Sequence, residues 1–465
     1  MFANAWGKEK KMEYNELTAI SPIDGRYRNT VGELSEFFSE YAFMKYRIKV
    51  EIKWLIHLLE MNIINENASE EEIQRINNIY EYFDVEKCKR VKEIENITNH
   101  DVKAVEYYVR EEIEKIGLKR LCCFVHFGCT SEDINNLAYN LMIKGAMNSI
   151  ILPAMDTLVY QVKENAKKYA SIPMLSHTHG QPATPVTVGK ELSVFVYRWQ
   201  NSLKYINSIV SDLQGKFSST VAAFNAWQVS FPQIDWIEEN KRFVEKLGLN
   251  FNLFATQIEN HDTICTLFSM IKSFNNITQD FNSDMWLYTS LGYFKQKVIS
   301  TETGSSVMPH KVNPINHESS MANTRMANSI FDSLTNNLQV SRMQRDLSDS
   351  SMLRNIGVAF SHTLLSIKQS QKGFAKMEVN EDILRKELNN NPEVLAEAVQ
   401  TILRKNKYDN AYELLKEFTR GKDINIDNLR EFINGLDIDQ NDKEMLLNLT
   451  PEMYIGLSSK LCDMI

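Results

Sequence analysis

Hydrophobic residues recur at a helical period in the first third of the chain. Between Val31 and Leu59, aromatic and aliphatic residues return every three or four positions, as they do on the buried face of a helix. Thr130 is a residue type that caps helices, and two acidic residues follow it in what would be the first turn. The pattern therefore predicts one helix over about 31–59 and another that starts at Thr130 and runs past Met147.

The middle third alternates long helical patterns with two segments rich in proline, glycine and polar residues. Apolar residues from Ile271 to Gln296 step by three or four, which predicts a helix of about 26 residues, or about 39 Å at about 1.5 Å per residue. The two polar segments, Ser171–Gly189 and Ser300–Pro314, are predicted to be loops. Helices of this length are typical of a long helical bundle rather than of a βαβ unit.

Toward its C-terminus the chain becomes rich in lysine, glutamate and asparagine. Asn391-Pro392 and Thr450-Pro451 are predicted to start short helices, because proline is favoured in the first turn of a helix. These changes in pattern divide the chain into three predicted domains. They are an N-terminal helical domain over 1–122, a central long-helix bundle over 123–365 and a small helical domain over 366–465.

Glycine and proline are scarce. The 465 residues include 17 glycines and 10 prolines, roughly 4% and 2% against usual values of about 7% and 5%. Because β-rich and Rossmann-type folds need many turns, this scarcity disfavours both. Together with the helical periods, it predicts an all-α fold.

The charge balance argues against some classes of partner. The chain has 52 basic and 60 acidic residues and a formal net charge of −8, which offers no general electrostatic footprint for nucleic acid or an anionic membrane. No apolar stretch approaches the roughly 18 residues that a membrane span needs, and the first residues lack the apolar core of a signal peptide. We therefore expect a cytoplasmic protein that binds neither nucleic acid nor a membrane.

The spacing of cysteine and histidine predicts no metal site. The six cysteines contain no CxxC pair, which argues against a disulfide framework and a zinc site. His177 and His179 could form a metal pair, but no Glu-x-x-His or His-Glu-x-x-His motif accompanies them. Neither a metal nor an organic cofactor is expected.

The segment Thr301–Pro314, TETGSSVMPHKVNP, has the most informative chemistry of the chain. Gly304 lets the backbone take positive φ, two serines follow it, and Lys311 and Asn313 add a cation and an amide. Successive N–H groups beside a lysine form a cradle for a carboxylate. The alternative is an ordinary helix connection. A Walker loop is excluded, because no Gly-Lys-Ser/Thr follows at the required distance.

GSSVMPHKVNP closely resembles the signature of the fumarase/aspartase superfamily, whose members eliminate fumarate from succinyl compounds. Within that superfamily the chain is most similar to the adenylosuccinate lyase family of the bacterial purine-biosynthesis type. The resemblance covers about the first 360 residues, and the matching segments occur in the family's order. They are SPIDGRY at 21–27, TNHDVKAVEY at 98–107, TSED at 130–133, THGQPATP at 178–185, TQIENHD at 256–262 and RDLSDSSMLRNIG at 345–357.

The resemblance implies an elimination reaction. Splitting a C–N bond beside a succinyl carbon needs a base for a weakly acidic C–H, donors that stabilise the aci-carboxylate, and an acid for the departing nitrogen. The family's base falls on Ser305 and its acid on His179, with His100 in a supporting role. From the residues alone, a lone histidine is more often structural than catalytic.

The resemblance also implies a set of substrate-binding residues. Taken alone, these positions fit capped helix starts and solvated charged faces, although arginine forks suit phosphate well. A net-acidic protein that handles a nucleotide needs such local cations. The implied substrate-binding residues are Arg26, Tyr27, Asn99, Asp101, Thr130, Ser131, Thr178, Gln257, Ser306, Lys311, Asn313, Arg345, Ser350 and Arg354.

The chain departs from the family pattern at three places. His177 stands where arginine is expected, Ser319 stands where asparagine is expected, and the segment Lys216–Asn225 lacks glycines that are common in the family. The first two departures could tune substrate affinity, and the third could alter how helices approach each other. None of them removes the implied acid or base.

The resemblance thus implies a lyase for succinylated purine nucleotides that assembles as a homotetramer, with each site built by loops from three chains. Two alternatives remain. Another fumarate-releasing lyase, such as argininosuccinate lyase, fumarase or aspartase, is disfavoured by SPIDGRY and RDLSDSSMLRN. A catalytically silent helical scaffold is disfavoured by the retention of Ser305, His179, Lys311 and Asn313.

Overall fold

The computed structural model describes residues 14–64, 66–297, 307–308, 310–421 and 424–465. They form two compact units, and five long helices of the described chain contribute residues to both. Unit 1 comprises Met1–Met155, Ser202–Asn276 and Ala322–Ser366, and unit 2 comprises Asp156–Asn201, Ile277–Met321 and Ile367–Ile465. The division into three domains stays a prediction.

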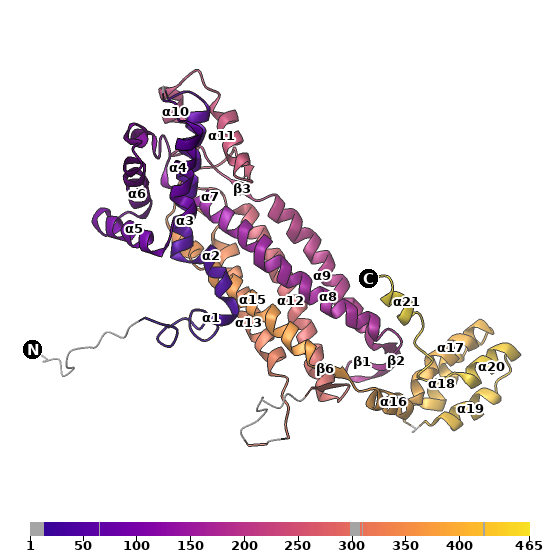
Figure 1. The fold of residues 1–465 in the computed structure, drawn as a ribbon. Coiled ribbons are helices and arrows are strands. Elements are labelled where there is room, and N and C mark those ends of the chain that lie inside the picture. Colours follow the sequence, from indigo (N-terminus) through magenta and orange to yellow (C-terminus); the bar gives the residue numbers. More distant parts are fainter. Residues whose placement is uncertain (1–13, 65, 298–306, 309, 422–423) are drawn as a thin grey trace, which may run out of the picture. The chain divides into compact units, whose positions relative to one another are not determined.

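Helices make up most of both units (Figure 1). Those wholly in unit 1 are α1 (Arg28–Val31), η1 (Gly32–Leu34), α2 (Ser35–Phe38), α3 (Glu40–Glu60), α4 (Glu70–Glu81), α5 (Val85–Thr98), α6 (Asp101–Lys115), η2 (Lys119–Phe124), α7 (Ser131–Ala146), η3 (Met147–Ile151), α10 (Asn225–Ser230), α11 (Trp236–Lys246) and α14 (Ser348–Leu353). Those shared by both units are α8 (Leu152–Lys168), α9 (Val188–Ser211), α12 (Asp262–Ser290), α13 (Ile315–Asn337) and α15 (Ile356–Ala375). Those wholly in unit 2 are α16 (Glu381–Asn390), η4 (Pro392–Leu395), α17 (Ala396–Lys405), α18 (Ala411–Thr419), α19 (Ile426–Asn434), α20 (Gln440–Asn448) and α21 (Ser458–Cys462). The predicted all-α class is confirmed.

Short strands pair in three two-stranded sheets within the described residues. The pairs are β1 (Pro173–Thr178) antiparallel with β2 (Gln181–Thr187), β3 (Gln214–Gly215) parallel with β4 (Asn250–Phe251), and β5 (Phe294–Gln296) antiparallel with β6 (Met377–Val379). The β1–β2 hairpin occupies the segment 171–189, for which the prediction of a loop is wrong. Gly180 fits the hairpin because it lies in the turn, where its positive φ favours glycine.

One predicted helix, over 31–59, is interrupted. Ser39 adopts an extended backbone (φ −79°, ψ 162°), and its Oγ accepts a hydrogen bond from Ala42 N at 3.1 Å. Ser39 thereby caps α3, because a side-chain oxygen at this position replaces a missing helical partner. The helical spacing is correct on both sides of the break, but the expected continuity is wrong.

The other predicted boundaries are partly right. α7 starts after Thr130 and continues through the π-helical turn η3 into α8, as predicted. α12 begins at Asp262, before the predicted start, and ends ahead of Gly292, whose φ of 78° leaves the helical region. Pro392 starts a short 3₁₀-helix as predicted, whereas Pro451 lies in a turn and starts no helix.

Buried polar side chains form layers between the long helices. In unit 2, Asn282 donates to the hydroxyls of Ser320 at 3.1 Å and Ser370 at 2.7 Å, and its Oδ1 lies 2.7 Å from His317 Nδ1. All four side chains are buried, and burial lowers the pKa of His317 to about 4. The layers of unit 1 are Thr324–Ser366 at 2.6 Å, Asn323–His362 at 2.8 Å and Asn275–Thr363 at 3.1 Å.

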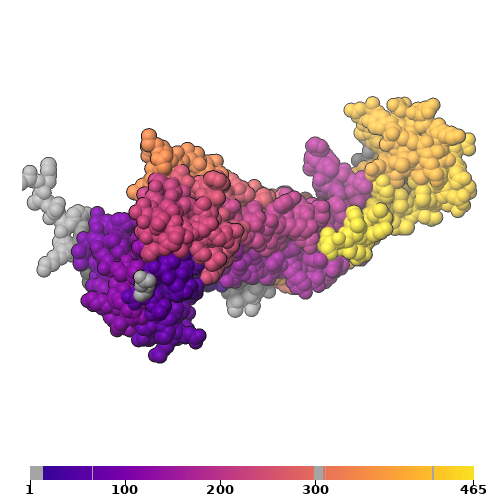
Figure 2. Space-filling view, turned by 90° about the horizontal axis from the view of Figure 1, so that it is seen from above, coloured from indigo at the N-terminus to yellow at the C-terminus, as the bar shows by residue number. Residues whose placement is uncertain are grey.

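The C-terminal helices of unit 2 have a hydrophobic core of their own. Buried leucine, valine, isoleucine and alanine side chains between Leu395 and Leu446 form it. Figure 2 shows the residues that form α17–α20 as a compact lobe in orange to yellow colours. No helix among the described residues has both the length and the apolar character that crossing a membrane requires.

Candidate functional site

The junction of α5 and α6 in unit 1 carries the first candidate residues. Asn99 ends α5 in the left-handed conformation (φ 51°), and His100 caps α6 with its Nδ1 accepting from Lys103 N at 3.1 Å. Because an accepting Nδ1 leaves the ring proton on Nε2, the other nitrogen of His100 is a donor. The side chain of His100 is 52% exposed, so this donor can reach a bound molecule.

Asp101 lies between two arginines. Its Oδ2 accepts from Arg47 Nη2 at 2.6 Å and from Arg354 Nη2 at 3.3 Å. Burial acts to raise the pKa of this carboxyl, but the charge and hydrogen bond of Arg47 outweigh burial and hold the pKa below its usual value. Arg354 also pairs with Glu40 at 3.0 Å. The two candidate segments that carry Asp101 and Arg354 therefore meet.

A polar network continues from Arg47 into the core of unit 1. Arg47 Nε donates to Asn135 Oδ1 at 2.8 Å, and Asn135 Nδ2 donates to Glu132 Oε1 at 2.8 Å. Arg345 donates to the same oxygen of Glu132 at 3.1 Å and to the two oxygens of Asp349 at 3.0 and 2.8 Å. Burial raises the pKa of Glu132, and the charge of Arg345 opposes that rise. The guanidinium of Arg345 is thus engaged by two carboxylates.

The loop that holds Gln257 is tied to the same network. Gln257 N donates to the carbonyl of the residue before Arg345 at 3.1 Å. His261 Nε2 lies 3.4 Å from Asp349 Oδ2. Burial acts to raise the pKa of Asp349, but His261 and Arg345 keep it below its usual value. Ser350 N donates to the same carboxylate at 2.6 Å within α14.

The start of α7 presents Thr130 and Ser131. Thr130 N donates to Asp133 Oδ2 at 2.8 Å, and Asp133 Oδ1 forms an ion pair with Lys216 Nζ at 2.7 Å. Neither side chain of this pair is exposed. The helix terminus is therefore anchored from within the core, and its first N–H groups can receive an anion.

The segment Lys216–Asn225 keeps a backbone that favours glycine although it contains none. Ser219, Ala222 and Phe224 have φ values of 69°, 57° and 56°, a region that costs residues with a side chain roughly 1–2 kcal/mol each. Lys216 Nζ donates to the carbonyl of Ser219 at 2.6 Å and helps to hold this turn. The segment thus forms a turn of residues with positive φ although it contains no glycine.

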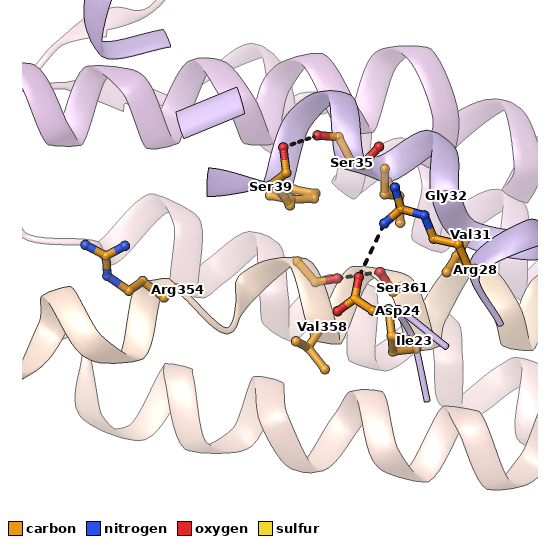
Figure 3. Close-up of a pocket in the computed structure, with 13 residues that line it drawn as sticks. Ile23, Asp24, Arg28, Val31, Gly32, Ser35, Ser39, Arg354, Val358 and Ser361 are labelled. Carbon is orange, nitrogen blue, oxygen red and sulfur yellow. Dashed lines mark hydrogen bonds and ion pairs between the residues drawn. The ribbon is translucent and has the colours of Figure 1, made fainter. Parts of the chain in front are cut away.

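A cavity of about 210 Å³ in unit 1 lies between the N-terminal segment and α15 (Figure 3). Its walls include Asp24 and Arg28, which pair at 3.5 Å, and Arg354 of the opposite segment. Arg26 is exposed and Tyr27 half-buried, and both lie in the turn between these wall residues. The structure thus brings the segment SPIDGRY and Arg354 to the walls of one cavity.

In unit 2, Thr178 and His179 lie at the tip of the β1–β2 hairpin. His179 (φ 54°) and Gly180 (φ 72°) form its two-residue turn, and Thr178 pairs with Gln181. Positive φ at both turn positions gives a tight turn whose twist matches that of the paired strands. His179 is exposed, and among the described residues its imidazole has no hydrogen-bond or ion-pair partner. Its ring can therefore meet a substrate.

Part of the signature lies outside the described residues, including Ser305 and Ser306. Lys311 is exposed, and its backbone N–H donates to Met308 O at 3.1 Å in a turn. Asn313 is half-buried, and α13 follows two residues later. Within unit 2 the described cation and amide thus stand at the start of a long helix.

Sequence reasoning missed the buried residues that connect the candidate segments of unit 1. Arg47 is 1% exposed on the apolar helix α3, and Asn135 is buried on α7. A charged or amide group inside a helix that is otherwise buried needs a partner, since an unpaired one is costly. A basic residue at a position that the apolar period predicts to be buried, such as Arg47, was therefore the sequence signal that indicated this network.

Comparisons with known proteins give the family. Residues 25–330 match the family model described as lyase, and residues 341–455 match the one described as adenylosuccinate lyase C-terminal. An adenylosuccinate lyase of Legionella pneumophila (strain Corby) is 46% identical over 453 residues, which cover 97% of this chain and 99% of that protein. The chain belongs to the adenylosuccinate lyase family. The Escherichia coli (strain K12) member of this family is 44% identical over 455 residues, with the same coverage.

Solved structures share the fold of this adenylosuccinate lyase family member at low sequence identity. A fumarate lyase from Mesorhizobium sp. BNC1 superposes with a TM-score of 0.75 at 17% identity, over 93% of this chain and 97% of that one. The 3-carboxy-cis,cis-muconate lactonizing enzyme from Pseudomonas putida gives a TM-score of 0.74 at 19% identity, over 94% and 97%. The mostly helical fold class is thus supported independently of the motifs.

Proposed function

We propose that this adenylosuccinate lyase family member cleaves adenylosuccinate to AMP and fumarate in the cytoplasm. It releases fumarate in the same way from the succinylated aminoimidazole carboxamide ribotide. The observation that carries the proposal is the identity of 44–46%, over 97% of the chain, to proteins named adenylosuccinate lyase. The reaction moves protons and breaks one C–N bond, so its chemistry calls for no redox cofactor.

The elimination assigns two proton transfers to two residues. Ser305 removes the proton from the succinyl methylene, and His179 protonates the departing nitrogen. The exposure of His179 at the tip of a tight turn supports its role, because a general acid must reach the atom that it protonates. A serine is a poor base at its ordinary pKa, so a cation such as Lys311 and the N–H groups of the signature must stabilise its alkoxide.

The remaining residues bind the succinyl group. Thr130 and Ser131 stand at the N-terminus of α7, where backbone N–H groups favour a carboxylate. Gln257 lies on a loop anchored to the same polar network, and the Nε2–H of His100 supplies a donor. Thr178, Ser306 and Asn313 complete this proposed set of contacts, with Asn99 and Asp101 beside His100.

The nucleotide is proposed to lie along the arginines of unit 1. Arg354 is better placed than Arg345 to meet a phosphate, since 43% of its side chain is exposed against 20%. Arg26 and Tyr27 stand in the segment that shares a cavity wall with Arg354. Ser350 follows the carboxylate that orients Arg345. Arginine forks bind phosphate through two parallel hydrogen bonds, which supports this assignment.

Purified protein tests the activity directly. We expect it to release fumarate from adenylosuccinate in a one-to-one ratio with AMP, measured by coupled fumarate detection and by chromatography of the nucleotide. Argininosuccinate and aspartate, offered at the same concentration, are the controls for the rival lyases. Fumarate from either control without turnover of adenylosuccinate would contradict the proposal.

A homotetramer with shared sites is proposed from the family resemblance and from the surface of the single chain. Large apolar side chains are exposed on the long helices, among them Tyr160, Tyr197, Trp286 and Leu287 of unit 2. Exposed apolar surface of this kind is typical of a face that associates with another protein. A second copy of the chain is the proposed occupant.

Mixing two inactive variants tests the shared site. His179→Ala and Ser305→Ala proteins, mixed under conditions that exchange subunits, are expected to regain part of the fumarate release, because some mixed sites take both intact residues from different chains. Each variant subjected alone to the same treatment is the control. Mixtures that stay inactive, while mass spectrometry shows that subunits exchange, would contradict a site built from several chains.

A further inference from the structure

The hairpin that carries His179 contains a β-bulge. One residue of β1, Leu175, opposes two residues of β2, Thr184 and Pro185. A bulge bends its strand and redirects whatever lies beyond it. The bulge at Thr184 and Pro185 therefore determines the direction of the hairpin tip, and with it the position of the His179 imidazole.

The hairpin is packed at its base and bare at its tip. Leu175 is buried against Leu388, which belongs to α16, and Val394, which belongs to η4. Beyond the bulge, the residues from Thr178 to Pro182 are exposed, whereas the side chain of His177 is 24% exposed and its Nε2 lies 3.8 Å from Glu387 Oε1 of α16. The direction of the exposed tip therefore depends on the contacts at the bulge, together with the contact of His177 with Glu387.

One carboxylate holds the bulge from outside the hairpin. Thr184 Oγ1 donates to Glu397 Oε2 at 2.5 Å, and Tyr454 OH donates to the same oxygen at 3.1 Å. Glu397 belongs to α17, in the helical lobe that follows the hairpin in unit 2. Burial and the charge of Glu397 raise the pKa of Tyr454 to about 12, so the phenol keeps the proton that it donates.

The hairpin beyond the bulge acts as a short lever. Thr184 lies three positions along the strand from Gln181 at the turn, which is about 10 Å at roughly 3.3 Å per residue. A tilt of about 6° at the bulge would move the tip by about 1 Å. A displacement of that size costs a reaction about 100-fold in rate when it separates reacting groups.

We propose that Glu397 is a positioning residue for the acid of the reaction: by holding Thr184 at the bulge, it sets the direction of the hairpin and hence the place of the His179 imidazole. This inference rests on the proposed function of His179. Glu397 itself touches no reacting atom in this scheme. The C-terminal lobe of unit 2 thereby affects the reaction through the hydrogen bond between Glu397 and Thr184 of β2.

Replacing Thr184 tests the contact with little change of shape. Thr184→Val removes the hydroxyl and Thr184→Ser keeps it. Thr419→Val is the matched control, because among the described residues its hydroxyl bonds to Leu415 O of its own helix α18. The contact between Thr184 and Glu397 is exposed, so its loss should not unfold the protein. Three experiments are made: steady-state kinetics, which gives kcat and KM for fumarate release, exchange of the succinyl methylene proton with solvent, and hydrogen–deuterium exchange of the backbone over 176–183.

We expect Thr184→Val to lower kcat about tenfold with KM unchanged within twofold, and to speed hydrogen–deuterium exchange over 176–183. Exchange of the methylene proton should persist, since that step belongs to the base. Thr184→Ser should restore kcat, and Thr419→Val should match the parent protein. Adding Glu397→Ala to Thr184→Val should cause no further loss, because both changes remove the same contact between residues 184 and 397.

Three results would overturn the inference: a normal kcat in Thr184→Val, an equal loss of cleavage and of methylene exchange, or failure of Thr184→Ser to restore kcat. A parent protein that releases no fumarate would instead overturn the proposed function, and with it the part of Glu397 in the reaction. Even then, hydrogen–deuterium exchange over 176–183 would show whether Thr184 holds the hairpin. The two failures are thus distinguishable.

Discussion

Ser305→Ala and His179→Ala are each expected to lower kcat by about 10²- to 10⁴-fold, equivalent to about 2.7–5.4 kcal/mol of barrier. Each change removes one proton transfer while leaving the proposed nucleotide contacts in place, so adenylosuccinate should still bind. Steady-state kinetics and calorimetric binding of substrate measure the two effects separately. Ser306→Ala is the matched control, and it should cost less kcat and show more of its effect in KM.

Hydrogen exchange at the succinyl methylene separates the two roles. A protein without the acid should still exchange this proton with solvent, whereas one without the base should not. An active Ser305→Ala protein beside an inactive Ser306→Ala protein would move the base one residue along the signature. A Ser305→Ala protein that exchanges the proton at the parent rate would remove the serine from this role altogether.

Asp133→Asn is expected to lower the free energy of unfolding by about 3–5 kcal/mol, because it leaves the ammonium of Lys216 buried without its counter-charge. The pair is fully buried, and Lys216 would keep its bond to the carbonyl of Ser219. Urea denaturation followed by circular dichroism measures the change. Glu86→Gln breaks the exposed pair with Lys89 and is the matched control, with an expected loss of at most about 1 kcal/mol.

The double variant Asp133→Asn, Lys216→Met sharpens this test. It removes both charges, so no unpaired ion is buried, and part of the lost stability should return. If the double variant were less stable than Asp133→Asn by the full cost of Lys216→Met alone, the two side chains would be energetically independent. The ion pair at 2.7 Å would then contribute no interaction energy between the two side chains.

Much of the fold follows from local patterns. The period of apolar residues predicts the region of α3 and the long helix α12, because helices bury one face and repeat every 3.6 residues. The break at Ser39 was not predicted, since the apolar spacing continues across it. The hairpin at 173–187 was missed because its prolines and glycine are typical of loops as well as of a bulged two-stranded ribbon.

The candidate site is predictable only in part. The resemblance names segments, but local pattern does not say which of them touch. Arg47 meets Asp101 across 54 residues of sequence, and Arg345 meets Glu132 across 213. Contacts of such separation depend on how helices pack, so they come from the tertiary structure. The roles of Ser305, His179 and the proposed substrate contacts stay predictions.

The polar layer around Asn282 has a geometric consequence. Apolar ridges repeat along a helix, so two helices joined by leucine alone can slip by one turn, about 5.4 Å, with modest loss. A hydrogen bond tolerates only a few tenths of an ångström. The contacts of Asn282 with His317 and Ser370 therefore allow only one axial position of α12 relative to α13 and α15. They fix the axial register at the start of α13, and so the height at which Lys311 and Asn313 emerge from unit 2.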